Sequence, residues 1–196
     1  MPVTYTNRKG DTYYLCQGTT KTGKLRYYFA RQPKERSPDQ IPDGYRISES
    51  VNGVVSLVKD RPQLILPQEV ASVEAALDRH PKNLDYRIAV QKNQIVIYER
   101  LGPDVETLSE IFGKFSPFPS GTVKRQVQEQ LDKMARFSPI LRFILVDPEE
   151  RRFIAERWSY LGNVEDWIEI GESGKLGNLA RRLIPKLRTD DFFELY

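Results

Sequence analysis

The sequence predicts an α+β fold, in which a small antiparallel β domain precedes a larger domain of helices and β-hairpins. Short β-rich segments separated by turn residues occupy the first 62 residues, and this pattern predicts the small sheet. Farther along the chain, apolar residues at helical spacing alternate with further hairpin patterns. A chain of 196 residues is long enough for both parts, so we expect domains at residues 1–62 and 63–196.

Two hairpins are expected in the first domain. Their strands are residues 12–17, 25–30, 45–49 and 54–58. The first turn contains Gly18 and Gly23, and the second contains Asn52-Gly53, a pair typical of two-residue hairpin turns. A domain this short buries only a marginal core, so we expect its sheet to need a second domain or a partner chain.

The second domain is predicted to consist of helix–hairpin–helix units. The expected helices begin near Pro67, Asp104, Thr122 and Leu176, and the expected strands are residues 86–90, 95–98, 141–146, 151–158 and 167–170. Pro185 is expected to end or kink the last helix. Because residues 68–112 and 122–188 repeat the order helix, hairpin, helix, an internal duplication is an open alternative to two unrelated units.

Composition excludes several classes of protein. A single cysteine, Cys16, cannot form an internal disulfide or a cysteine-based zinc site, and a single histidine, His80, excludes most histidine-built metal centres. No apolar run is long enough to span a membrane, and no secretory signal begins the chain. We therefore expect a cytoplasmic protein with no cofactor, no metal and no membrane association.

Positive charge is concentrated at the N-terminus. The whole chain has a formal charge of +3, whereas residues 1–36 contain eight basic and two acidic residues. That segment therefore carries +6 and the remainder −3. A basic patch of this kind attracts polyanions, but it also keeps a small sheet soluble, so charge alone leaves both interpretations open.

The first hairpin offers the most informative surface. Side chains alternate across a strand, so Tyr13-Tyr14 and Tyr27-Tyr28 each place one ring on either face. With Gly18 set opposite Lys24, the odd-numbered face is a small core of Tyr13, Leu15, Leu25, Tyr27 and Phe29. The even-numbered face is then Tyr14, Cys16, Lys24, Arg26, Tyr28 and Ala30.

Rings interspersed with cations are typical of surfaces that bind single-stranded nucleic acid, because bases stack on the rings and cations hold the phosphates. The residues expected to bind are Tyr14, Lys21, Lys24, Arg26, Tyr28 and Arg31. In the alternative interpretation, Tyr14 and Tyr28 pack against the second domain, since tyrosine suits either environment.

Two glycine-rich loops resemble phosphate-binding sequences only in part. Gly18 to Lys24 has the spacing of a phosphate loop, but Leu25 replaces the Ser or Thr and a strand follows where the motif needs a helix. Gly171 to Gly177 precedes a basic helix, and one interpretation of this loop is an anion site at the helix N-terminus. Its residues would be Gly174, Lys175, Arg181 and Arg182. In the alternative, Ser173 caps an ordinary amphipathic helix.

No catalytic constellation is evident. The acidic pairs Glu149/Glu150 and Glu165/Asp166 fall in predicted turns or loops, and Cys16 with His80 lacks an orienting third group. We therefore expect a non-enzymatic binding protein. The alternative is a protein-interaction or assembly component, with a partner protein or a homo-oligomer formed through the N-terminal sheet and the aromatic tail at residues 191–196.

Overall fold

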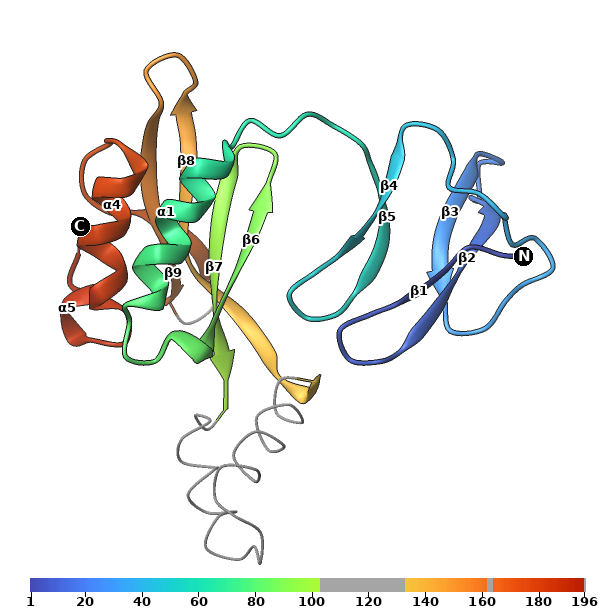
Figure 1. Cartoon of the computed structure of the whole chain (residues 1–196), viewed down its shortest axis with the longest axis horizontal. Helices are drawn as coiled ribbons and strands as arrows, with labels where there is room; N and C mark the ends of the chain where they lie inside the picture. The colour runs from blue at the N-terminus through green and yellow to red at the C-terminus, as the bar shows by residue number, and fades with distance from the viewer. Residues whose placement is uncertain (103–132, 162–163, 196) are drawn as a thin grey trace, which may run out of the picture. The chain divides into compact units, whose positions relative to one another are not determined.

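The computed structural model describes residues 1–102, 133–161 and 164–195 (Figure 1). These residues form two compact units, one built on residues 1–61 and 133–135 and the other on residues 62–102 and 136–195. We call them unit 1 and unit 2. Every pairing between the described strands is antiparallel, and helices are present beside the sheets, so the fold is α+β as predicted.

Unit 1 contains two small sheets. Strands β1 (Thr4–Thr6), β2 (Thr12–Thr19) and β3 (Leu25–Ala30) form one sheet in the order β1-β2-β3. Strands β4 (Tyr45–Glu49) and β5 (Val55–Lys59) form the other. Both predicted hairpins are confirmed, and β1 is an additional strand that the sequence pattern did not reveal.

The turn between β4 and β5 depends on its glycine. Gly53 has a φ of 77°, a backbone conformation that side chains with a Cβ rarely adopt. Its carbonyl accepts a hydrogen bond of 2.7 Å from Asn7 Nδ2, and Asn7 is buried. The turn that the Asn-Gly pair predicts is therefore also an anchor for the loop between β1 and β2.

Unit 2 is a five-stranded sheet with helices on one face (Figure 1). Its strand order is β10-β9-β8-β7-β6. The strands are β6 (Tyr86–Gln91), β7 (Gln94–Leu101), β8 (Arg136–Asp147), β9 (Arg152–Leu161) and β10 (Val164–Glu169). The helices are α1 (Pro67–Asp78), α4 (Leu176–Leu183) and α5 (Asp190–Phe193), with 3-10 turns η1 (Asn83–Asp85) and η2 (Ile184–Lys186).

One apolar core holds unit 2 together. Alternate residues of the central strands, among them Ile97, Leu141 and Phe143, are fully buried against α1 and α4. The C-terminal tail joins this core through Phe192, which has no exposed surface, whereas Phe193 is 54% exposed. The tail therefore packs on its own unit through its first ring.

Several details differ from the sequence-based expectations. Pro139 lies inside β8, beside a register shift between Ile97 and Tyr98 that accommodates a residue unable to donate a ladder hydrogen bond. The interpretation of Ser173 as a helix cap is wrong, because Lys175 occupies the N-cap of α4. Ser173 Oγ instead accepts a hydrogen bond of 2.8 Å from Arg152.

The predicted helix at residues 104–113 lies outside the described residues, as does the predicted helix from Thr122 onward except for residues 133 and 134, which are helical. The proposed duplication depends on both of them and stays a prediction. Within the described ranges, no helix combines the length and apolar character needed to cross a membrane.

Candidate nucleic-acid interface

The register of β2 and β3 sorts the hairpin residues into two faces. Gly18 pairs with Arg26 and Cys16 with Tyr28. The predicted register, with Gly18 opposite Lys24, is wrong by two residues because β2 continues to Thr19 before the turn begins. A shift of two leaves every side chain on the same face, so the even-numbered and odd-numbered sets are as predicted.

The odd-numbered face contributes Leu15 to the core of unit 1, but the prediction that Leu25 belongs to that core is wrong, because Leu25 at the turn end of β3 is 54% exposed. Leu15 has no exposed surface, and the Tyr27 ring lies 6.3 Å from the Tyr45 ring of β4, centroid to centroid. The Tyr5 hydroxyl also donates a 2.9 Å hydrogen bond to Glu49 of the second sheet. The odd-numbered face of the hairpin therefore packs against the β4–β5 sheet.

The even-numbered face is partly covered by the loop after β3. Cys16 is fully buried, and its Sγ atom lies 3.8 Å from Ser37 Oγ and 4.0 Å from the Gln32 carbonyl oxygen. The backbone of the same loop accepts a 2.8 Å hydrogen bond, from Gln17 N–H to Arg36 O. The binding surface on the even-numbered face is consequently smaller than the sequence suggested, because Cys16 at the centre of that face is not accessible.

Tyr28 and Arg26 form the accessible end of this face. The Arg26 guanidinium carbon lies 5.0 Å from the Tyr28 ring centroid, within the range of a cation–π contact. A Cβ atom on Gly18 would sit 3.3 Å from a carbon of the same ring, so the ring lies directly against the glycine. Tyr28 is thus held between a glycine backbone and an exposed guanidinium.

The predicted cations divide into two groups. Lys21, Lys24 and Arg26 are all exposed at the turn end of the hairpin, beside Tyr28. Arg31 is engaged elsewhere, since it forms an ion pair of 3.1 Å with Asp11 and lies 5.9 Å from the Tyr13 ring on the odd-numbered face. Tyr14 is half-buried at the opposite end of β2 from the turn.

The second predicted site, near α4, has its polar groups committed to local contacts. The Lys175 ammonium donates to the Glu150 carbonyl, and Arg181 donates a 2.6 Å hydrogen bond to Asn178. Gly174 pairs with a neighbouring strand residue through two backbone hydrogen bonds of 2.8 Å, and the Arg182 guanidinium lies over Gly171. The residues of this loop therefore point to separate partners rather than to one common anion position.

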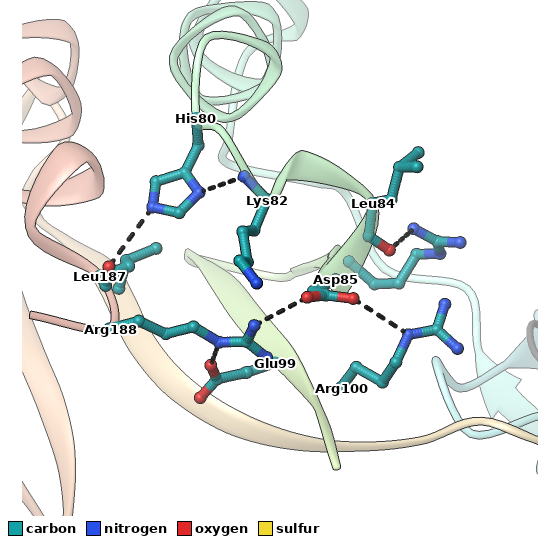
Figure 2. A network of polar contacts seen from close by, with 9 residues as sticks. His80, Lys82, Leu84, Asp85, Glu99, Arg100, Leu187 and Arg188 are labelled. Atoms are coloured by element: carbon teal, nitrogen blue, oxygen red, sulfur yellow. Dashed lines mark hydrogen bonds and ion pairs between the residues drawn. The ribbon is translucent and has the colours of Figure 1, made fainter. Parts of the chain in front are cut away.

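A charged network that the sequence did not suggest lies in unit 2 (Figure 2). The Asp85 carboxylate, with a side chain 4% exposed, pairs with Arg188 at 2.7 Å and with Arg100 at 3.4 Å. Arg188 also pairs with Glu99. Two carboxylates thus face two guanidinium groups, and the network ties the end of η1 to β7 and to the segment after η2.

His80 and Tyr86 border this network. His80 Nδ1 accepts a 3.1 Å hydrogen bond from Lys82 N–H, so the ring proton lies on Nε2, which is 3.3 Å from the Leu187 carbonyl (Figure 2). Burial, followed by the nearby Glu99 charge, raises the pKa of the Tyr86 hydroxyl. These contacts assign His80 a role in holding the C-terminal segment.

No group of three or more metal-ligating side chains occurs among the described residues. No known protein family, no curated protein and no solved structure matches this chain.

Proposed function

We propose that the turn end of the β2–β3 hairpin binds single-stranded nucleic acid through Lys21, Lys24, Arg26 and Tyr28. The observation that carries the proposal is the Arg26 guanidinium stacked at 5.0 Å on Tyr28, with two exposed lysines in the adjoining turn. Among the contacts of the described residues, the side chains of Lys21 and Lys24 have no intramolecular partner to give up on binding.

The chemistry of this surface suits an unpaired strand. A base stacks on a planar guanidinium as well as on an aromatic ring, and here the Tyr28 ring supports the guanidinium from below. The two lysines supply point charges for the phosphates. Since stacking and phosphate contacts are both insensitive to sequence, we expect little preference among bases, although pyrimidine runs are favoured by their flexibility.

Binding to a labelled oligothymidylate, measured by fluorescence anisotropy, tests the proposal. Three cations that each neutralise one phosphate give a slope of about −2 for the logarithm of the association constant against the logarithm of salt concentration. The Lys21→Ala/Lys24→Ala variant should reduce that slope to about −0.7, since one cation remains. Lys59→Ala, which removes an exposed cation of β5 in the same unit, is the matched control and should leave the slope unchanged.

The stacking contribution is tested separately. Tyr28→Leu should weaken binding by about 2- to 5-fold, because the Arg26 guanidinium loses the exposed cation–π contact that orients it, whereas Tyr28→Phe should bind like the original protein. Equal affinities for Tyr28→Leu and Tyr28→Phe, or a slope that Lys59→Ala reduces as much as the double lysine variant does, would contradict the proposal.

The alternative of a protein-interaction component acting through the aromatic tail has less support. Phe192 belongs to the core of unit 2, and Arg157 donates a 2.6 Å hydrogen bond to the Phe193 carbonyl. The tail therefore packs against its own unit. An enzymatic role at the Gly171–Gly177 loop has less support still, because the polar groups of that loop are committed to local contacts.

A further inference from the structure

The two tryptophans of the chain lie together on the sheet face of unit 2 that points away from its core. Phe153 and Ala155 of β9 belong to the core, so alternation along the strand places Trp158 on the opposite face. Trp158 pairs directly with Trp167 of β10, and their ring centroids are 5.1 Å apart in an edge-to-face arrangement. Both rings are partly exposed.

One tryptophan of this pair already holds a guanidinium. The Arg142 guanidinium of β8 lies 4.3 Å from the Trp167 ring centroid, and Arg142 Nε donates a 2.6 Å hydrogen bond to Glu156. Glu156 lies on β9, two residues before the position paired with Trp167. Trp167 and its diagonal neighbour Glu156 therefore form a binding motif for one arginine side chain.

The antiparallel pairing repeats this motif. A local twofold axis passes between Trp158 and Trp167, because paired residues of antiparallel strands are related in this way. The axis exchanges Trp158 and Trp167 and relates Glu156 to Glu165. Glu156 lies two residues before Trp158, the residue paired with Trp167, and Glu165 likewise lies two residues before Trp167, the residue paired with Trp158. Glu165 is exposed and has no ion pair among the described residues, so Trp158 and Glu165 form the same motif without its arginine.

The position of the missing arginine follows from the same symmetry. Arg142 lies directly opposite Glu156, on the strand beside β9. The arginine that the axis relates to Arg142 would lie opposite Glu165, on a strand beside β10. Because β10 is the edge strand of the described sheet, that position is open to a strand from another chain. The Trp167 N–H donates a 2.7 Å hydrogen bond to the Asp166 carboxylate, and a strand added at this edge would offer a backbone carbonyl as the acceptor instead.

Charge identifies what kind of segment this edge accepts. Residues 165–172 contain four acidic residues, no basic residue and hence a formal charge of −4, within a chain of net charge +3. The acidic residues, all exposed, are Glu165, Asp166, Glu169 and Glu172. A second copy of β10 would set carboxylates against carboxylates, and nucleic acid would be repelled, whereas a basic segment is complementary.

We propose that the β10 edge binds an extended, arginine-bearing segment of a partner protein, with one arginine opposite Glu165 and stacked on Trp158. This proposal is independent of nucleic-acid binding by the hairpin, because it uses a different unit and opposite charges.

A synthetic peptide with arginine at every second position tests the proposal, since alternate side chains of an added strand share one face. Binding to the full chain is followed by tryptophan fluorescence, which reports on this face alone because the chain has two tryptophans. Glu165→Gln should weaken binding by about three- to fivefold, as expected for one exposed ion pair. Glu149→Gln, which neutralises an exposed carboxylate in the turn between β8 and β9, is the control and should have no effect.

A matching peptide with lysine in place of arginine should bind about threefold more weakly, because the planar guanidinium stacks on indole better than an ammonium does. Equal binding of the two peptides, or equal effects of Glu165→Gln and Glu149→Gln, would reduce the interaction to general charge attraction and overturn the proposal. Self-association of the chain at low salt that Glu165→Gln abolishes would also overturn it, by making a second copy the occupant. The Lys21→Ala/Lys24→Ala variant should bind the arginine peptide normally, so a failure of nucleic-acid binding leaves this result interpretable.

Discussion

Replacing Asp85 with asparagine should destabilise unit 2 by about 3 kcal/mol. The Asp85 side chain is 4% exposed and pairs with two arginines, of which Arg100 is equally buried. Removing one partner of a buried ion pair costs about 3–5 kcal/mol, because the remaining charge keeps its desolvation penalty. We place Asp85→Asn at the low end of that range, because Arg188 is 29% exposed and the amide still accepts one hydrogen bond.

Urea unfolding followed by tryptophan fluorescence measures this loss. Both tryptophans belong to β9 and β10, so the signal reports the unfolding of unit 2. A loss of about 3 kcal/mol corresponds to a fall of roughly 6–12 °C in melting temperature for a protein of this size. Glu74→Gln, which neutralises an exposed carboxylate of α1, is the control and should change stability by less than about 0.5 kcal/mol. A loss below about 1 kcal/mol for Asp85→Asn, or one equal to that of Glu74→Gln, would refute the assignment of the network as a structural anchor.

Three further predictions concern stability. Tyr86→Phe should stabilise unit 2 by about 1 kcal/mol at neutral pH, because the buried Tyr86 hydroxyl has no hydrogen-bond partner among the described residues. Burial raises the pKa of the Tyr86 hydroxyl above its ordinary value of 10.0, so this group leaves stability independent of pH below about pH 10 and the native state loses stability as the pH rises further. Tyr86→Phe lacks that loss and should unfold less readily than the original protein in alkaline urea titrations. Glu69→Ala should cost about 2 kcal/mol in the same assay, because this carboxylate binds Arg151 and accepts a 2.8 Å hydrogen bond from Leu66 N–H at the start of α1; a loss equal to that of Glu74→Gln would contradict this role. Gly53→Ala should destabilise unit 1 by about 1–2 kcal/mol, since φ is 77° and the new Cβ would lie 3.2 Å from a buried amide, and thermal melts by circular dichroism would show an unchanged midpoint if this account were wrong.

The sequence was informative wherever local rules determine the structure. The Asn52-Gly53 pair correctly predicted the turn between β4 and β5, and alternation correctly assigned the two faces of the first hairpin despite a register error of two residues. Strand parity survives such an error because the side-chain repeat is two residues. Alternation along the strand was therefore enough to predict that Arg26 and Tyr28 lie on the same face of the hairpin.

Features that depend on distant residues were not predictable. Asp85 and Arg188 are 103 positions apart, and neither carries a local pattern that distinguishes it from an ordinary surface charge. The loop that covers Cys16 contacts it through Ser37 and a backbone carbonyl, interactions that no periodicity encodes. Strand β1, with three residues, is too short to show a repeat at all.

The arginine-binding motif of Trp158 and Glu165 could not be predicted from either strand alone, because it depends on how β9 pairs with β10. Glu165-Asp166 reads in sequence as a solvated acidic pair, and Trp167 as one apolar residue of a strand. The relation between Glu165 and Glu156 follows from the register that pairs Trp158 with Trp167. Because β10 is the edge strand, an arginine equivalent to Arg142 would have to come from another chain. The net charge of +3 does not show that the N-terminal hairpin is basic and the β10 edge is acidic, so we expect the two surfaces to attract ligands of opposite charge. Salt should consequently weaken both interactions, while exchanging the sign of the ligand should abolish each of them at its own site.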